Sequence, residues 1–102
     1  MLINADNSRS VLSGITVTHS SLFNGRGKEE DKSVLVSQGD NAITDSSISN
    51  LQNASMEWSG TLNFSNSTLK NEAGITLHDL TMQGGTVNNR ADVVASNSNL
   101  LA

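Results

Sequence analysis

An eight-residue pattern constrains this chain more than any other feature of its sequence. Residues 62–69 read LNFSNSTL, with apolar residues at the first, third and eighth positions and a serine at the sixth. A single strand would continue its alternation throughout, but here the alternation stops at Ser65 and Asn66 and resumes at Ser67. The pattern therefore indicates two short strands joined by a bend, with a small residue facing inward at the corner, where a larger one would clash.

The pattern recurs along the chain. Exact copies are ITVTHSSL at 15–22 and VVASNSNL at 93–100, and near copies are NAITDSSI at 41–48, ITLHDLTM at 75–82 and LTMQGGTV at 80–87. In the near copies Asn41 takes the first place, and Leu80 or Gly85 takes the place of the serine. Starts at 15, 41, 62 and 93 differ by 26, 21 and 31 residues, which is the repeat length of a parallel β-solenoid. A helix is not expected, because the apolar spacing follows a period of two and Asn, Gly and β-branched residues are frequent.

The composition fits a thin, repeated core. Aromatic residues make up only 3% of the chain, whereas 16 Ser, 8 Thr and 13 Asn are present. Such a chain is expected to bury Val, Ile and Leu along an axis and to turn through polar corners. The net charge of −4 argues against a nucleic-acid partner or an anionic membrane, and no apolar run is long enough for membrane insertion. The absence of Cys excludes disulfides and thiolate metal sites.

These observations predict one β-helical segment over residues 1–102, with about four rungs. An exposed charged loop is predicted at residues 23–33, FNGRGKEEDKS. Trp58 is expected to pack against a neighbouring rung. The inward side chains are predicted to be Leu62, Phe64, Leu69, Ile75, Leu77, Leu80, Met82 and Val87. Stacked Asn and Ser side chains are expected to hydrogen-bond along the axis, and the uncapped ends are expected to associate end to end.

The stretch NASMEWSGTLNFSNSTL, followed by GITLHDLTMQGGTVNN, resembles the passenger domains of bacterial autotransporters of type V secretion. Trp58, Gly60, residues 80–82 and residues 84–87 carry the resemblance, which covers residues 41–102 better than residues 1–40. It implies a right-handed parallel β-helix on the cell surface at the outer membrane, or secreted, with a role in virulence. A complete autotransporter also has a signal peptide and a membrane barrel, so the chain is expected to be a segment of a longer passenger.

The sequence offers little that points to catalysis. The serine-protease passengers carry a Gly-Asp-Ser-Gly motif, but here Gly39 and Asp40 are followed by Asn41. His78 and Asp79 are expected to point outward at a corner. The acids considered for a glycoside-cleaving pair are Asp40, Asp45, Glu57, Glu72, Asp79 and Asp92. Asp45 could stack near Glu57 or Asp79 on one face, but the register is not fixed by the sequence and an isolated surface acid is the usual case. No residue is assigned to catalysis, a cofactor or a metal.

The remaining surface signals are short. Thr16 and Thr18 in ITVT have the spacing of ice-binding solenoids, although a single copy makes no array and favours an ordinary half-buried strand. Asn53, Asn63 and Asn66 stand in glycosylation sequons, which are frequent by chance in a chain so rich in Asn, Ser and Thr.

Two functions remain open. The first is a structural and adhesive segment that binds a host-surface glycan or protein, or a second copy of itself, through a ladder of Ser, Thr, Asn and Asp side chains, without a cofactor. The alternative is the stalk of a β-helical enzyme, either a secreted serine protease autotransporter or a polysaccharide-degrading spike.

Overall fold

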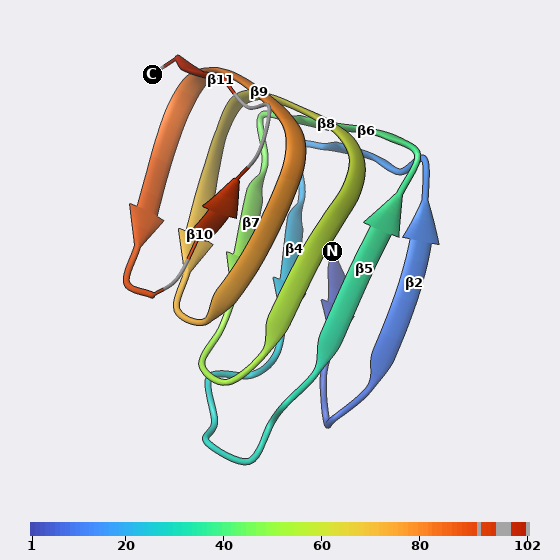
Figure 1. Cartoon of the computed structure of the whole chain (residues 1–102), viewed down its shortest axis with the longest axis vertical. Coiled ribbons are helices and arrows are strands. Elements are labelled where there is room, and N and C mark those ends of the chain that lie inside the picture. Colours follow the sequence, from blue (N-terminus) through green and yellow to red (C-terminus); the bar gives the residue numbers. More distant parts are fainter. Residues whose placement is uncertain (92, 96–98, 102) are drawn as a thin grey trace.

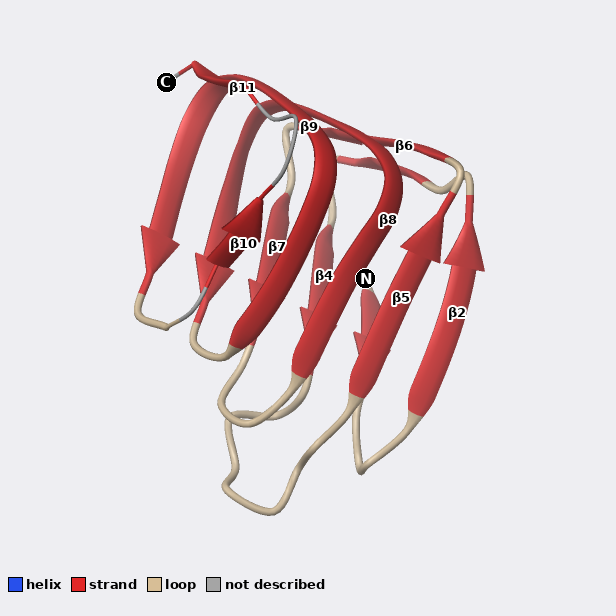
Figure 2. Ribbon diagram, viewed as in Figure 1, coloured by secondary structure: helices blue, strands red, loops and turns tan. Residues whose placement is uncertain are grey.

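The computed structural model describes residues 1–91, 93–95 and 99–101, and in these residues it contains strands and no helix (Figure 2). The strands are β1 (Leu2–Asn4), β2 (Arg9–Ser13), β3 (Thr16–Thr18), β4 (Ser21–Asn24), β5 (Val34–Gln38), β6 (Asp40–Thr44), β7 (Ser47–Asn50), β8 (Ser55–Asn71), β9 (Gly74–Asn89), β10 (Val93–Ala95) and β11 (Asn99–Leu101).

Every strand pairing is parallel, and the chain winds as a parallel β-helix (Figure 1). Each rung has three faces. Face A contains β2, β5, residues 55–58 of β8, residues 74–77 of β9, and β10. Face B contains β3, β6, residues 61–65, residues 79–83 and β11. Face C contains β1, β4, β7, residues 67–71 and residues 85–89. The predicted solenoid of about four rungs is confirmed.

The eight-residue pattern spans the corner between faces B and C. Its copies at 15, 41, 62 and 80 stack in one register, because Val17, Ile43, Phe64 and Met82 are successive partners. The copy at 93 instead pairs with the copy at 75, through Val93 with Ile75 and Leu100 with Met82. The six stretches therefore belong to two registers one face apart, not to a single repeat as the sequence suggested.

Apolar columns fill the space inside the rungs. Trp58, Leu62, Phe64, Leu69, Ile75, Leu77, Leu80 and Met82 are all at most 3% exposed. The column Leu22, Ile48, Leu69 and Val87 runs along face C, and its last member is 38% exposed. Val87 continues the predicted inward column but stays partly exposed, because a solenoid side chain is covered only where a neighbouring rung lies over it. Leu12, Ile15 and Val17 are half-buried at the opposite end of the core.

The charged loop is shorter than predicted. Phe23 and Asn24 belong to β4, and Asn24, Asp31 and Ser33 are buried, so the exposed stretch is residues 26–30 together with Lys32. The Asp31 carboxylate accepts hydrogen bonds from the backbone N–H groups of Asp6 and Asn7, at 3.0 and 3.2 Å. This connection is the long one between β4 and β5 in Figure 2, and Asp31 ties it to the preceding turn.

Candidate functional site

The corner between faces C and A is closed by an internal asparagine ladder. Asn4, Asn24, Asn50, Asn71 and Asn89 occupy successive rungs, and each amide nitrogen donates to the next side-chain oxygen at 2.9 Å. The first four are buried. The amides also donate to backbone carbonyls, as Asn50 does to Gly74 at 2.9 Å. The expected stacking of Asn is therefore present, but it lies inside the molecule and stiffens the corner instead of forming a binding face.

The corner between faces B and C combines an unusual backbone with a serine ladder. His19, Asp45, Asn66 and Gly84 stand one after another in the rungs, all with positive φ between 49° and 66°. The backbone N–H groups of Ser20 and Ser46 each donate to the next serine hydroxyl at 3.0 Å. The hydroxyls of Ser20, Ser46 and Ser67 each donate to the backbone carbonyl two residues earlier in the chain.

Side chains also stack on the outside of this corner. His19 Nε2 lies 3.7 Å from Asp45 Oδ2, and the Asn66 amide donates to Asp45 Oδ1 at 2.8 Å. Sequence reasoning missed the positive φ, although the fifth position of the pattern carried a signal. His, Asp, Asn and Gly, found there in the four stacked copies, are the residues that most readily adopt left-handed conformations.

The structure separates most of the candidate acids. Asp45 lies at the corner between faces B and C, Glu57 lies on face A, and Asp79 lies on face B, so Asp45 shares a face with neither of the other two. Asp40, Thr61 and Asp79 are partners in successive rungs, and the Thr61 hydroxyl donates to Asp40 at 2.7 Å.

His78, Glu57 and Glu72 each lie near an oppositely charged or titratable side chain close by. His78 Nε2 lies 3.8 Å from Glu57 Oε2, and both side chains are nearly half exposed. Glu72 pairs with Lys70 at 3.4 Å, and Asp92 lies outside the described residues. Within residues 1–91, 93–95 and 99–101, no three His, Cys, Asp or Glu side chains gather in a way that suits a metal ion. The same residues include no helix long and apolar enough to span a membrane.

Face B presents two rows of short uncharged side chains to the outside. One row is Thr16, Ala42, Asn63 and Thr81, and the other is Thr18, Thr44, Ser65 and Gln83. Thr16 and Thr18 are therefore the first members of an array that the single stretch ITVT did not reveal. Successive members of each row lie about 4.8 Å apart because the strands are parallel neighbours. The two rows are a regular set of mostly hydroxyl and amide groups, and the row of Asp40, Thr61 and Asp79 lies beside them on the same face.

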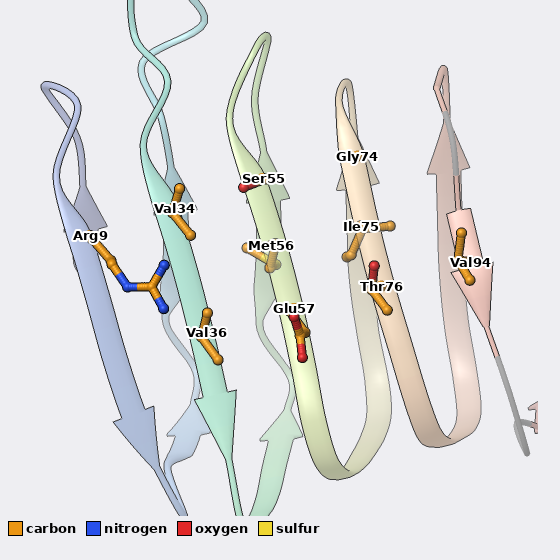
Figure 3. A pocket seen from close by; sticks show the side chains of 10 residues that line it. All are labelled: Arg9, Val34, Val36, Ser55, Met56, Glu57, Gly74, Ile75, Thr76 and Val94. Carbon is orange, nitrogen blue, oxygen red and sulfur yellow. The ribbon is translucent and has the colours of Figure 1, made fainter.

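The outer side of face A carries apolar and charged side chains, unlike the two uncharged rows of face B. Arg9, Val34, Val36, Glu57, Thr76 and Val94 line a shallow depression of about 300 Å³ (Figure 3). Ser55 and Gly74, whose side chains are short, also line it. The depression combines the half-buried Val34 and Val36 and the exposed Val94 with one positive and one negative side chain.

The chain matches no protein-family model, no curated protein and no solved structure.

Proposed function

We propose that the chain is a structural and adhesive β-helix segment of a bacterial autotransporter passenger, displayed on the cell surface or secreted. The observation that carries the proposal is the two regular rows of uncharged side chains on face B, most of which end in a hydroxyl or amide group. The resemblance around Trp58 and residues 84–87 supplies the autotransporter part of the proposal. The fold supports it, since a β-helix is a stiff rod whose outer faces are free for contact.

A neutral glycan is the ligand whose chemistry fits face B. Its hydroxyl groups both donate and accept hydrogen bonds, as the Thr, Ser, Asn and Gln side chains of the two rows do. An extended glycan can lie along the axis and meet the same kinds of group at every rung. Since the ligand is neutral, binding is expected to depend little on salt, even though Asp40 and Asp79 flank the two rows on the same face.

Glycan binding can be measured with the fluorescently labelled chain on an array of neutral and acidic glycans. We expect binding to neutral glycans, unchanged by moderate salt. Asn63→Arg places a long charged side chain in the middle of face B and should reduce binding at least tenfold. Lys28→Glu in the exposed loop is the control and should bind like the natural chain. Failure to bind any glycan, or equal binding by the Asn63→Arg variant, would contradict the proposal.

A further inference from the structure

Face A carries one positive and one negative side chain, Arg9 and Glu57, on opposite sides of strand β5. Arg9 on β2 is the partner of Val34 on β5, and Val36, two residues further along β5, is the partner of Glu57 on β8. Arg9 and Glu57 therefore lie on the two strands that flank β5, at diagonally opposite corners of a patch centred between Val34 and Val36. Figure 3 shows the Arg9 side chain reaching from β2 towards β5.

The groups of this patch are available for contact. Among residues 1–91, 93–95 and 99–101, no ion pair and no side-chain hydrogen bond engages the Arg9 guanidinium, which is exposed. Glu57 is 47% exposed and has only His78 near its carboxylate, at 3.8 Å. Val11 and Val94, in the same outward row as Val36 and Glu57, are 55% and 62% exposed. The patch thus has half-buried valines at its centre, exposed valines in the same row on β2 and β10, and two opposite charges that lack a strong internal partner.

We propose that face A is a self-complementary surface that pairs with face A of a second copy of this chain. In a two-fold dimer, residue i contacts residue j while j contacts i. An axis that passes between Val34 and Val36 brings each Arg9 guanidinium over the Glu57 carboxylate of the other copy. The valines of the two copies then meet at the centre, away from water. Two charge pairs and one apolar contact form together, and no charge is left unpaired.

This inference goes into more detail than the self-association considered above, because it names the face and the partner. It does not depend on glycan binding, which we place on face B. It also differs from end-to-end association, in which open strand edges add rungs without limit, whereas a two-fold dimer is closed. The face is small: strands of about 15 Å across four to five rungs present roughly 300 Å² per copy. Interfaces of this size are weak, so the dimer is expected at high protein concentration.

Charge reversal provides a sharp test by analytical ultracentrifugation of the full chain. The natural chain is expected to form dimers, and no larger species, as its concentration rises into the range of roughly 100 μM to 1 mM, which corresponds to a weak complex. Arg9→Glu gives a patch with two negative charges, and Glu57→Arg gives one with two positive charges. Each variant alone should therefore dimerise at least tenfold more weakly.

The two single variants should dimerise with each other when mixed in equal amounts, because each Glu at position 9 then meets an Arg at position 57 and each remaining Glu57 meets an Arg9. The double variant Arg9→Glu with Glu57→Arg should dimerise like the natural chain. Lys28→Glu is the control for a change of net charge and should not alter dimerisation.

Three results would overturn the inference: a natural chain that stays monomeric, single variants that dimerise as well as the natural chain, or a mixture that fails to recover. Circular dichroism spectra of the variants show whether each is folded, and failure of one single variant to fold leaves the double variant as the test. Glycan binding by the face A variants separates the two proposals. A chain that dimerises as described but binds no glycan contradicts the adhesive function alone.

Discussion

Asparagine at the corner between faces C and A illustrates how single residues hold this fold. Asn50 accepts from Asn24 and donates both to Asn71 and to the carbonyl of Gly74. These partners lie where water has no access, since Asn24, Asn50 and Asn71 are 0% exposed. Each buried polar group left without a partner costs about 1–3 kcal/mol, so one asparagine supports several of its neighbours.

Asn50→Ala is expected to lower the free energy of unfolding by roughly 2–4 kcal/mol, because it removes three hydrogen bonds at once. Urea unfolding followed by circular dichroism measures the change. Asn63→Ala is the matched control, since Asn63 is exposed on face B, and it should change stability by less than about 0.5 kcal/mol. Equal effects of the two substitutions would show that the ladder does not stabilise the corner.

Asp31 is expected to make the stability depend on acid pH. Hydrogen bonds from the Ser33 hydroxyl, 2.5 Å from Asp31 Oδ1, and from the backbone N–H groups of Asp6, Asn7 and Ser33 together lower the pKa of this carboxyl to about 2, although burial acts in the opposite direction. A carboxylate whose pKa is lower in the folded state than in the unfolded state stabilises the fold above its unfolded pKa. That stabilisation is lost as the pH falls from about 4 to about 2.

Urea unfolding at several pH values between 2 and 6 measures this dependence. The natural chain should lose stability steeply below pH 4, and Asp31→Asn should show a shallower slope and a lower plateau at pH 6. The slopes are compared within that range, so that the other carboxyl groups contribute equally to both proteins. Identical slopes would mean that Asp31 is not held as described.

At the scale of elements, β8 passes from face A to face B at a corner where its backbone lies very close to the backbone of the adjacent rung. Gly60 lies in β8 at the register irregularity between Trp58 and Thr61. A Cβ atom at this position would lie 2.0 Å from the carbonyl oxygen of Gly39 in the adjacent rung. Gly74 has nothing within 4 Å of such an atom, and neither glycine has a positive φ. The two positions therefore differ in space, not in backbone conformation.

Gly60→Ala is expected to destabilise the chain by at least about 2–3 kcal/mol, because the rungs must move apart at this corner. Gly74→Ala should be neutral or stabilise the chain by up to about 1 kcal/mol, since alanine restricts the unfolded chain more than glycine does. Thermal unfolding of the two variants side by side gives the comparison. If Gly60→Ala unfolds no earlier than Gly74→Ala, adjacent rungs do not approach at this corner as described.

Sequence reasoning recovered the strands best where apolar residues alternate. Leu62, Phe64 and Leu69 predicted both the inward side chains and the bend, because burial on one side of a strand imposes a period of two. Stacked asparagines were predicted, but their position inside the molecule was missed, even though Asn24, Asn50, Asn71 and Asn89 each follow an inward residue of the pattern by two positions. A search for apolar periodicity does not detect a buried amide whose partners lie in other rungs.

The surface was harder to predict than the core. The copies at 75 and 80 share residues, and only strand register decides which one stacks on 62. Likewise, Thr18, Thr44, Ser65 and Gln83 become neighbours only when loops of unequal length bring their rungs into line. The patch on face A could not be predicted for the same reason. Arg9 and Glu57 are far apart in sequence, and they lie near each other only because their strands flank β5.

For the whole molecule, the central claim is that rungs of unequal sequence length stack in parallel at one constant rise. Along face B, Thr18 is followed by Thr44, Ser65 and Gln83, one, two and three rungs away. Parallel neighbours at about 4.8 Å put the three backbone separations near 5, 10 and 14 Å. The three steps cross 26, 21 and 18 residues of sequence, yet each covers the same distance along the axis.

Pairs of nitroxide spin labels test this claim most directly, because the chain has no cysteine and labels attach only where Cys is introduced. The double variants carry Cys at 18 and 44, at 18 and 65, or at 18 and 83, and their electron paramagnetic resonance spectra are compared with those of the single variants. We predict dipolar broadening that is strongest for 18 and 44, weaker for 18 and 65, and weakest for 18 and 83. Broadening of equal strength in all three pairs, or strongest in a pair other than 18 and 44, would contradict the stacked parallel β-helix.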